Sequence, residues 1–375
     1  MAGRPHRPPA ARAVLLAGLL LAALLLAACS SDRDPSSSPT ATRQPVSSDA
    51  SASTDATPTA TAAGERDLDV DRLVVPAASS GLPPGWRERF VVPYGPGPES
   101  LGTAPGGDSG SLDLGPEYGA PAPDGTWWFL DAAKRRLAHH DADGRYLGAV
   151  RLGPDLLVDG TLFQWQLPHV LDDGTLVAAR QEPDRTWLLR LRDGRPDQVA
   201  VDGSFAPTYS DGRLLYGSSA EGRPVAVDPA DGSLRRVAAY RTPSGTPFTL
   251  TPARRLRLAL PDVGVARALP LVTASGAPAH VGLQVRAGAD DVLHVFLTGV
   301  GEDDESVQLV GATSIDPRGR VAEPEALPTP FPEADPGSPA QLVLAPGSST
   351  PALVYVLPDG VHVLERTRPV DLPAP

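Results

Sequence analysis

The chain has 375 residues, enough for one large or two modest domains, because a single hydrophobic core stops growing at about 250 to 300 residues. Its 45 acidic residues outnumber its 33 lysines and arginines, for a net charge of −12. This balance argues against nucleic acid as a partner, since phosphate binding needs a basic face, and the single cysteine, Cys29, excludes a disulfide framework within the chain.

Residues 1–28 have the composition of a secretory signal peptide. Arg4, Arg7 and Arg12 form a basic segment, and an apolar run follows that is too short for a comfortable spanning helix of about 20 residues. The run ends in LAACS, with small residues directly before Cys29. This ending resembles the lipobox of bacterial lipoproteins, which implies cleavage before Cys29 and a diacylglycerol on its thiol. The alternatives are an ordinary secretory signal with a chance cysteine and an uncut anchor helix.

Residues 29–64, which follow the signal, are nearly all Ser, Thr, Ala, Pro and Asp. Such a segment has almost nothing apolar to bury, so we expect a disordered stalk that begins at the lipidated Cys29. A flexible chain of this length places the next domain tens of ångströms from the membrane. We therefore expect a protein on the extracytoplasmic side of the cell membrane. Its acyl chains would hold it there, because its acidic charge does not favour anionic lipid.

Residues 65–375 are predicted to form one domain of strands and turns. Short apolar or alternating runs recur, and Gly and Pro interrupt the chain too often for long helices. Asp-Gly suits tight hairpins because both positions tolerate positive φ. Four-stranded antiparallel units that repeat every 40 to 50 residues or so are typical of β-propeller blades. Asp-Gly occurs here in three pairs, 19, 20 and 20 residues apart, at Asp124 and Asp143, Asp173 and Asp193, and Asp211 and Asp231.

The best-formed unit reads DGTWWFLD, then RRL, then DADGRYL, within residues 124–147. It resembles one repeat of the NHL-type propellers, in which Asp-Gly precedes an aromatic or aliphatic strand and a second Asp-Gly follows the next strand. Lys134 stands near the Asn of that family's pattern, and His140 stands at its Phe. The later units keep mainly the Asp-Gly turns, so the resemblance covers one blade well and implies the propeller fold for the rest.

Counting forward from this unit predicts an all-β propeller, with six blades of four strands. The expected blades are residues 115–153, 160–202, 204–241, 245–274, 278–328 and 338–368. In the fourth and fifth blades Asp-Gly is missing, and other turns that contain Pro and Gly take its place. A strand over residues 87–92 is expected to complete the last blade and to close the ring, because closure removes exposed sheet edges.

Two clusters in the first blade suggest metal sites, but strand geometry favours structural roles. His139 and His140 are adjacent, and adjacent strand residues point to opposite faces, so one strand does not supply both rings to one ion. The segment DADG at residues 141–144 begins like a calcium loop but lacks the later acids and the closing Glu. Trp127 and Trp128 likewise face opposite sides, so at least one packs between blades. We assign no metal ligand.

Propellers commonly bind ligands over the central channel, through loops between second and third strands. In the predicted blades these loops are residues 131–135, 181–185, 218–223 and 299–306, and they mix acids with arginines. An aromatic ring after a long connection between blades is a further candidate, for stacking on a flat ligand. The predicted ligand or partner residues are Asp131, Lys134, Arg135, Trp165, Glu182, Asp184 and Arg185. The alternative is that the loop charges are only solvated and the aromatics only pack.

The chain lacks the sequence signatures of serine hydrolases, zinc peptidases, phosphate-binding loops and dinucleotide folds. We therefore assign no catalytic residue and no cofactor. The expected function is that of a monomeric, lipid-anchored propeller that binds an envelope protein or a polar small molecule without catalysis. The alternative is an exported propeller enzyme, of the calcium-dependent lactonase or sugar dehydrogenase type, with calcium at the central channel. Fold alone does not decide between them.

Overall fold

The structure is a computed structural model that describes residues 72–103, 118–156, 165–182, 184–251, 255–302, 308–328 and 340–368. The chain divides into two units, Met1–Arg66 and Asp67–Pro375, and every described residue belongs to the second. The predicted signal peptide, Cys29 and the predicted stalk all lie outside the described residues. Within the described ranges, no helix combines the length and the apolar character that crossing a membrane requires.

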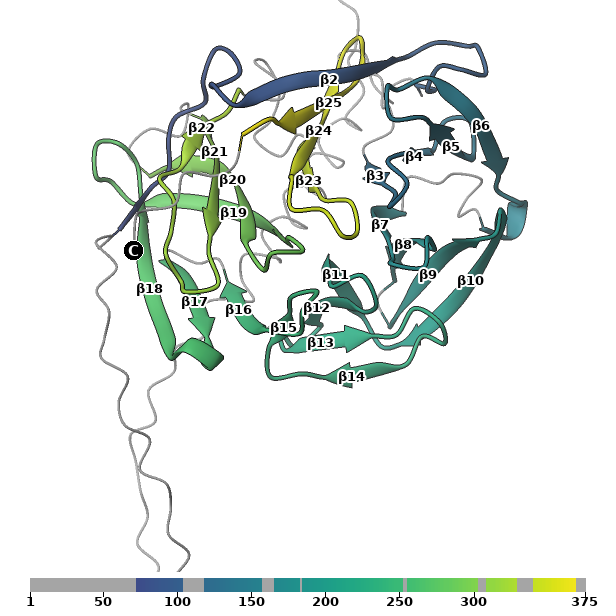
Figure 1. Ribbon diagram of the computed structural model, residues 1–375. Helices are drawn as coiled ribbons and strands as arrows, with labels where there is room; N and C mark the ends of the chain where they lie inside the picture. Colours follow the sequence, from purple (N-terminus) through teal and green to yellow (C-terminus); the bar gives the residue numbers. More distant parts are fainter. Residues whose placement is uncertain are drawn as a thin grey trace, which may run out of the picture. The chain divides into compact units, whose positions relative to one another are not determined.

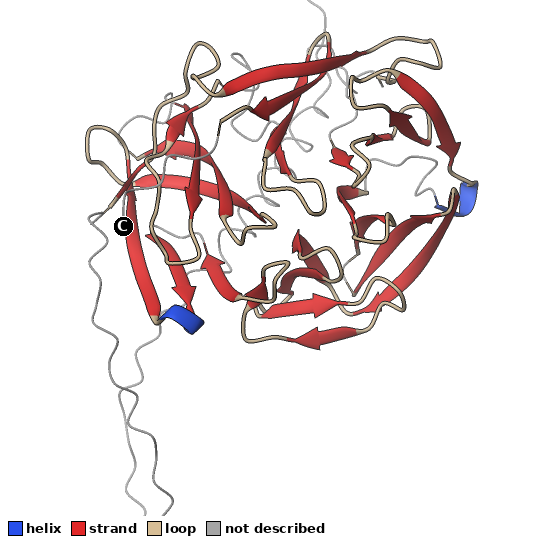
Figure 2. Ribbon diagram, viewed as in Figure 1, coloured by secondary structure: helices blue, strands red, loops and turns tan. Residues whose placement is uncertain are grey.

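The second unit is a ring of six β-sheets around a central axis (Figure 1, Figure 2). Strands dominate the described residues, and the helical segments are the short 3₁₀ turns η1 (Pro154–Leu156) and η2 (Pro261–Val263). Within each sheet, neighbouring strands are mostly consecutive in the chain and antiparallel. The predicted fold, an all-β propeller with six four-stranded blades, is confirmed.

In the first three sheets, the strands follow one another from the centre of the ring outward. Their strands are β3 (Gly119–Pro121), β4 (Trp127–Asp131), β5 (Arg136–His140), β6 (Tyr146–Arg151), β7 (Gln166–Val170), β8 (Leu176–Gln181), β9 (Arg185–Arg192), β10 (Arg195–Asp202), β11 (Phe205–Ser210), β12 (Leu215–Ser219), β13 (Pro224–Val227) and β14 (Leu234–Arg236).

The last three sheets continue this order, with two additions from the N-terminal part of the unit. Their own strands are β15 (Tyr240–Arg241), β16 (Pro247–Thr251), β17 (Arg255–Leu260), β18 (Val265–Val272), β19 (Ala279–Ala287), β20 (Leu293–Gly301), β21 (Gln308–Ile315), β22 (Glu325–Ala326), β23 (Ala340–Val343), β24 (Ala352–Leu357) and β25 (Gly360–Arg366). The two additions are β1 (Leu73–Val74) and β2 (Trp86–Pro93).

The Asp-Gly turns behave as their chemistry predicts. The glycines of all six have positive φ, between 72° and 92°. In the first of them, Asp124 Oδ1 accepts a hydrogen bond from the backbone N–H of Thr126 at 3.0 Å, which fixes the turn. These turns join first to second and third to fourth strands. Because strand direction alternates, they all lie on one face of the ring, here called the turn face. The loops between second and third strands lie on the opposite face, the loop face.

The ring closes as the sequence predicts. β2 pairs antiparallel with β25 in the sixth sheet, with Trp86 opposite Arg366 and a register shift between Glu88 and Phe90. Phe90 is 7% exposed and packs into the cluster that joins the sixth and first sheets. The expected closing strand at residues 87–92 is therefore confirmed. β1, which the sequence did not indicate, pairs parallel with β18 and adds a fifth strand to the fourth sheet.

The boundary between the third and fourth blades differs from the prediction. The expected third blade, residues 204–241, included Tyr240–Arg241, but these two residues are β15, the first strand of the fourth sheet. No Asp-Gly turn marks this boundary in the sequence. β15 is so short that β11 and β19, its neighbours on either side, contact each other directly. The ring of Tyr240 packs at 6.3 Å from that of Tyr209 and 5.8 Å from that of Phe248.

The hydrophobic core lies between neighbouring sheets, and the first sheet shows how its side chains are divided. Trp127 is 1% exposed and packs in the cluster shared with the sixth sheet, whereas Trp128 packs against the cluster shared with the second. His139 stacks on Trp128 with ring centroids 4.0 Å apart, and His140 contacts Phe129 at 5.3 Å. Both adjacent pairs therefore face opposite sides of the sheet, as strand alternation predicts.

Candidate functional site

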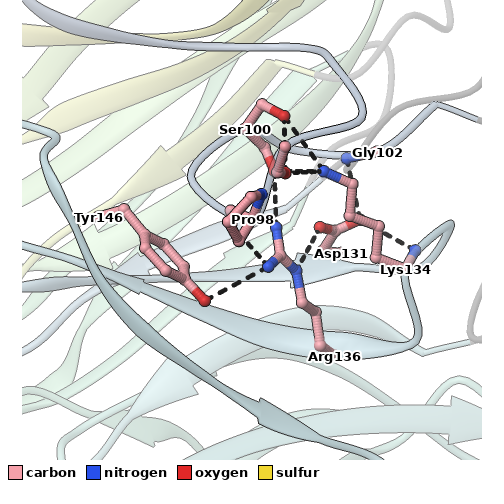
Figure 3. Close-up of polar contacts among 8 residues, drawn as sticks. Pro98, Ser100, Gly102, Asp131, Lys134, Arg136 and Tyr146 are labelled. Carbon is pink, nitrogen blue, oxygen red and sulfur yellow. Dashed lines mark hydrogen bonds and ion pairs between the residues drawn. The ribbon is translucent and has the colours of Figure 1, made fainter.

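The predicted loop at residues 131–135 contains a buried ion pair (Figure 3). Asp131 is fully buried, and its Oδ2 accepts a hydrogen bond from Arg136 Nε at 2.8 Å. Its Oδ1 accepts bonds from the backbone N–H groups of Gly102 at 3.1 Å and Lys134 at 3.2 Å. A buried pair is stable only when its remaining polar atoms are also satisfied. Both oxygens of this predicted ligand residue thus contact protein groups.

Lys134 of this loop and Arg136, the first residue of β5, fasten an upstream segment to the first sheet (Figure 3). Lys134 Nζ donates to the carbonyls of Gly97 at 2.6 Å and Ser100 at 2.7 Å. Arg136 Nη1 donates to Pro98 O at 2.7 Å, and its Nη2 donates to Ser100 O at 2.6 Å. Burial lowers the pKa of Lys134, and the nearby Arg136 lowers it further. These contacts join the segment after β2 to the β4–β5 loop.

The second group of predicted residues surrounds Arg180, a buried residue of β8 that sequence reasoning missed. The Arg180 guanidinium lies 5.0 Å from the ring centroid of Trp165 and 5.7 Å from that of Trp187. Its Nη2 donates to Glu182 Oε1 at 3.0 Å. The Arg185 guanidinium lies 5.8 Å from the same Trp187 ring. The structure therefore brings together Trp165, Glu182, Asp184 and Arg185, the last two as an ion pair at 3.6 Å.

Accessibility divides the predicted residues. Trp165 is 1% exposed and donates from Nε1 to Leu156 O at 2.9 Å, so a flat ligand reaches its ring only after neighbouring side chains move. The exposed residues of the set are Arg135, Asp184 and Arg185, and Glu182 is half-buried. That any of these residues binds a ligand or partner stays a prediction.

Of the other two predicted loops, residues 218–223 are fully described and residues 299–306 in part. In the loop at residues 218–223, the exposed Arg223 pairs with Glu221 at 3.3 Å. In the loop at residues 299–306, Glu302 pairs with His280 at 2.7 Å, and the acids that follow lie outside the described residues. Exposed pairs of this kind contribute little to stability, because water screens them.

A cavity lies at the centre of the ring on the turn face, opposite to the predicted loops. The centres of water-sized molecules can occupy about 50 Å³ of it, and the space between its walls is about 540 Å³ when the open solvent at its mouth is included. The ends of the innermost strands and the turns after them form its wall, with a contribution from every sheet. One lining residue from each sheet, in chain order, is Pro121, His169, Ser210, Pro243, Arg286 and Leu344. The cavity therefore depends on the assembled ring rather than on one blade.

Arg286, near the end of β19, is the charged group of this wall that burial affects most. It is 6% exposed, and its Nη1 donates to the carbonyls of Thr208 and Val285, both at 2.8 Å. No ion pair found among the described residues includes it. Burial lowers the pKa of Arg286 to about 10, still well above neutral pH. The cavity wall thus holds a buried positive charge without a bonded carboxylate.

His169, in β7, lines the same cavity. It is 7% exposed, and its Nε2 has no hydrogen-bond partner among the described residues. Burial, with a smaller effect from the positive charge of Arg286, holds the pKa of His169 well below its usual value. The imidazole is therefore neutral at neutral pH. A neutral imidazole donates from one nitrogen and accepts at the other, so it suits a polar ligand.

Two carboxylates also line the cavity, and both have protein partners. Asp211 Oδ2 accepts a hydrogen bond from Tyr216 Oη at 2.8 Å, and its Oδ1 accepts from the backbone N–H groups of Arg213 and Leu214 at 2.9 and 2.8 Å. Asp172 lies 3.8 Å from Arg213 Nε at the exposed rim. The acids of the cavity are thus engaged, whereas the guanidinium and the imidazole keep free polar atoms.

The family described as a domain of unknown function, DUF7485, matches residues 84–366. The chain belongs to this family. The match begins two residues before β2 and ends at the last residue of β25, so the DUF7485 unit contains the closing strand and every other described strand of the ring except β1. It includes both the loop-face groups and the central cavity. Among curated proteins, none matches the chain.

Several solved structures are similar to the DUF7485 chain at low identity. A catalytically inactive virginiamycin B lyase from Staphylococcus aureus with quinupristin is 12% identical, covers 69% of this chain and 97% of its own, and has a TM-score of 0.36. Regucalcin, a calcium-binding protein from Agrobacterium tumefaciens, is 13% identical, covers 80% of this chain and 98% of its own, and has a TM-score of 0.33. A putative exported protein from Bacteroides fragilis is 10% identical, covers 79% of this chain and 99% of its own, and has a TM-score of 0.42. These values carry no information on function.

Among the described residues of the DUF7485 ring, no three His, Cys, Asp or Glu side chains lie close enough to hold one metal ion. Sequence reasoning missed His169 and Arg286 because each stands alone in an apolar run, PHV and QVRA. The sequence feature that could have indicated them is a charged or titratable residue just before the first turn of a blade.

Proposed function

We propose that this DUF7485 protein is a lipid-anchored, extracytoplasmic binding module whose propeller takes a polar ligand in its central cavity without catalysis. One observation carries the binding part of the proposal. The cavity is lined by all six sheets and contains a buried cation, Arg286, that bonds only to backbone carbonyls. The anchor part rests on the lipobox-like sequence that ends at Cys29.

A buried charge is costly unless other groups compensate for its lost hydration. The two carbonyls on Nη1 compensate in part, and the rest of the guanidinium has no partner among the described residues. A ligand that bonds to the remaining N–H groups would supply the missing interaction. Binding at this point needs no motion of the ring, because the wall is already formed by packed strands.

The binding proposal is tested with the purified full-length protein in detergent, by thermal unfolding against a panel of sugars, amino acids, organic acids and inorganic salts. A ligand of the native state raises the midpoint temperature in a saturable way. The cavity variant is Ala289→Trp, at an exposed lining residue, and its matched control is Ala230→Trp, on an exposed turn of the same face. We expect the shift to persist in the control and to disappear in the cavity variant.

Two results would contradict the proposal of a cavity ligand. One is a panel without any saturable shift. The other is a shift that Ala289→Trp leaves intact, since binding would then occur elsewhere on the protein.

The anchor is tested separately by Cys29→Ala in cells. We expect the variant to leave the membrane fraction or to accumulate unprocessed, because no other residue offers a thiol for the diacylglycerol. A variant that is processed and stays with the membrane would show that lipidation of Cys29 is not the anchor.

A further inference from the structure

We propose that the ligand of the central cavity carries a carboxylate, which Arg286 binds in a bidentate manner through Nε and Nη2 while His169 contacts a neighbouring polar group of the ligand. This inference rests on the proposed function, because it names the chemical class of ligand for the same cavity. It concerns two residues of the inner strands, β7 and β19, and no residue of the loop face.

The guanidinium of Arg286 keeps two of its nitrogens open. Both hydrogen bonds of Arg286 within the described part of the chain leave from Nη1, to Thr208 O and Val285 O. Nε and Nη2 make none there. These two nitrogens form the side of a guanidinium that matches the two oxygens of a carboxylate, with parallel N–H···O bonds. The pairing that the protein leaves open is thus the one that is specific for a planar acid.

The third nitrogen, Nη1, is occupied because of an irregularity in β11. β11 has a register shift between Pro207 and Tyr209, so Thr208 has no register partner in β12. Its carbonyl therefore accepts from Arg286, and this bond joins β11 to β19 where the short β15 leaves them in direct contact. The bond also fixes the guanidinium before a ligand arrives. Such preorganisation reduces the entropy that binding costs.

His169 offers a second polar contact for the ligand. Its Nε2 is buried without a partner, and it lines the same cavity as Arg286. A buried polar atom without a partner is destabilising. A ligand hydroxyl, amide or carboxylate oxygen would satisfy it after a rotation of the imidazole, because Nε2 is closed to solvent in the free protein. Because the imidazole is neutral, it adds hydrogen-bonding capacity without a second positive charge. The site therefore offers one cation and one neutral polar group.

The apolar part of the wall favours an organic carboxylate over inorganic phosphate. Asp172 and Asp211 line the cavity together with the single guanidinium. Both carboxylates oppose any anion that enters, so an anionic ligand must gain from the guanidinium and from the apolar wall together. The remaining wall is largely Ala, Pro, Val and Leu, which suits an organic acid with a short carbon skeleton. An inorganic anion gains nothing from these apolar groups.

The test measures the midpoint of thermal unfolding of the full-length protein in detergent at pH 7. The probes are sodium lactate, sodium succinate and sodium phosphate, each compared with sodium chloride at equal ionic strength. We expect a saturable rise with lactate or succinate beyond that of chloride. Arg286→Lys should weaken the carboxylate affinity about 10-fold or more, because an ammonium does not form the bidentate pair. His169→Asn should weaken it by a smaller factor.

The matched control is Arg366→Lys, at an arginine that is 7% exposed but pairs with Glu325 in the closing seam. It should keep the wild-type carboxylate response whatever it does to stability. If Arg286→Lys does not fold, the wild-type protein still decides the question. The arginine Nε–H signals in a ¹⁵N-resolved spectrum should then include one that shifts with succinate and is unaffected by chloride.

The outcomes separate this inference from the proposed function. A saturable shift from a neutral sugar, lost in Ala289→Trp, with no carboxylate response would overturn the carboxylate assignment and leave the binding function in place. A response to phosphate alone would also overturn it. Unchanged carboxylate affinity in Arg286→Lys would show that another group binds the acid. Failure of every probe and of the whole panel would contradict both proposals.

Discussion

Two buried arginines near opposite faces of the ring differ in what surrounds them. Arg136, at the loop face, donates to the Asp131 carboxylate and to carbonyls of the segment after β2, so all three of its guanidinium nitrogens are bonded. Arg286, at the turn face, uses one nitrogen for two carbonyls and pairs with no acid among the described residues.

The difference teaches how to separate architecture from function in a fold that carries many charges. A buried cation with a complete set of protein partners stabilises the ring, and its removal is felt as lost stability. A buried cation with open donors costs stability in the free protein, so its retention needs another reason. The same residue type therefore predicts two different phenotypes, and substitutions at the two places test the distinction.

The largest effect is expected for Asp131→Ala. It leaves the guanidinium of Arg136 buried without a counter-charge, and breaking a buried pair in this way costs about 3 to 5 kcal/mol. Urea unfolding of the full-length protein measures the loss. The control is Asp143→Ala, whose partner Arg145 is 78% exposed in a pair of 3.7 Å; it should change stability by less than about 0.5 kcal/mol. Equal effects of the two substitutions would show that Asp131 is not a structural anchor.

The architecture could be predicted from the sequence because its determinants are local. Asp-Gly requires a turn wherever it stands, and three pairs at nearly constant spacing place twelve strands of the ring. Strand alternation alone put Trp127 and Trp128 on opposite faces. The boundary at Tyr240–Arg241 was wrong because β15 has two residues, and so short a strand leaves no pattern of its own.

The cavity could not be predicted in the same way, because its residues meet only when the ring is closed. His169 and Arg286 are 117 positions apart, and neither lies in a loop. The loops predicted from sequence were chosen because they are charged and expected to be exposed. These properties indicate contact with solvent but do not indicate where the surface forms a cavity. Asp131 illustrates the limit, since a loop acid that looks available in sequence is fully buried in the fold.

Low pH should destabilise the fold through His294, a buried histidine near the turn face. Burial lowers the pKa of His294, at the start of β20, from 6.5 to about 4; Asp290 opposes this shift and Arg366 adds to it. The unfolded chain then binds a proton that the folded chain does not, so stability is retained above pH 6.5 and falls as the pH drops toward 4. The expected loss at pH 4.5 is about 2 to 3 kcal/mol.

Urea unfolding at pH 7.0 and 4.5 measures this dependence, and His294→Gln should remove much of it while keeping a polar group beside Ser314, which lies 3.1 Å from the imidazole Nδ1. The exposed His280, paired with Glu302, provides the matched substitution, His280→Gln, which should leave the loss between the two pH values in place. If His280→Gln alone removed the acid sensitivity, the buried imidazole would not be its source.

The smallest effect is expected for Arg180→Lys at the loop face. The substitution keeps the positive charge and the proximity to Glu182, but it loses the planar contact with Trp165 and Trp187, which is worth about 1 kcal/mol. Thermal unfolding measures the change, and Arg192→Lys is the control, because its exposed side chain pairs loosely with Asp173 at 3.8 Å. The same substitution at Arg286 is expected to act on carboxylate binding instead. A loss of ligand affinity in Arg180→Lys would therefore assign binding to the loop-face residues predicted from sequence, and the contrast between the two faces would fail.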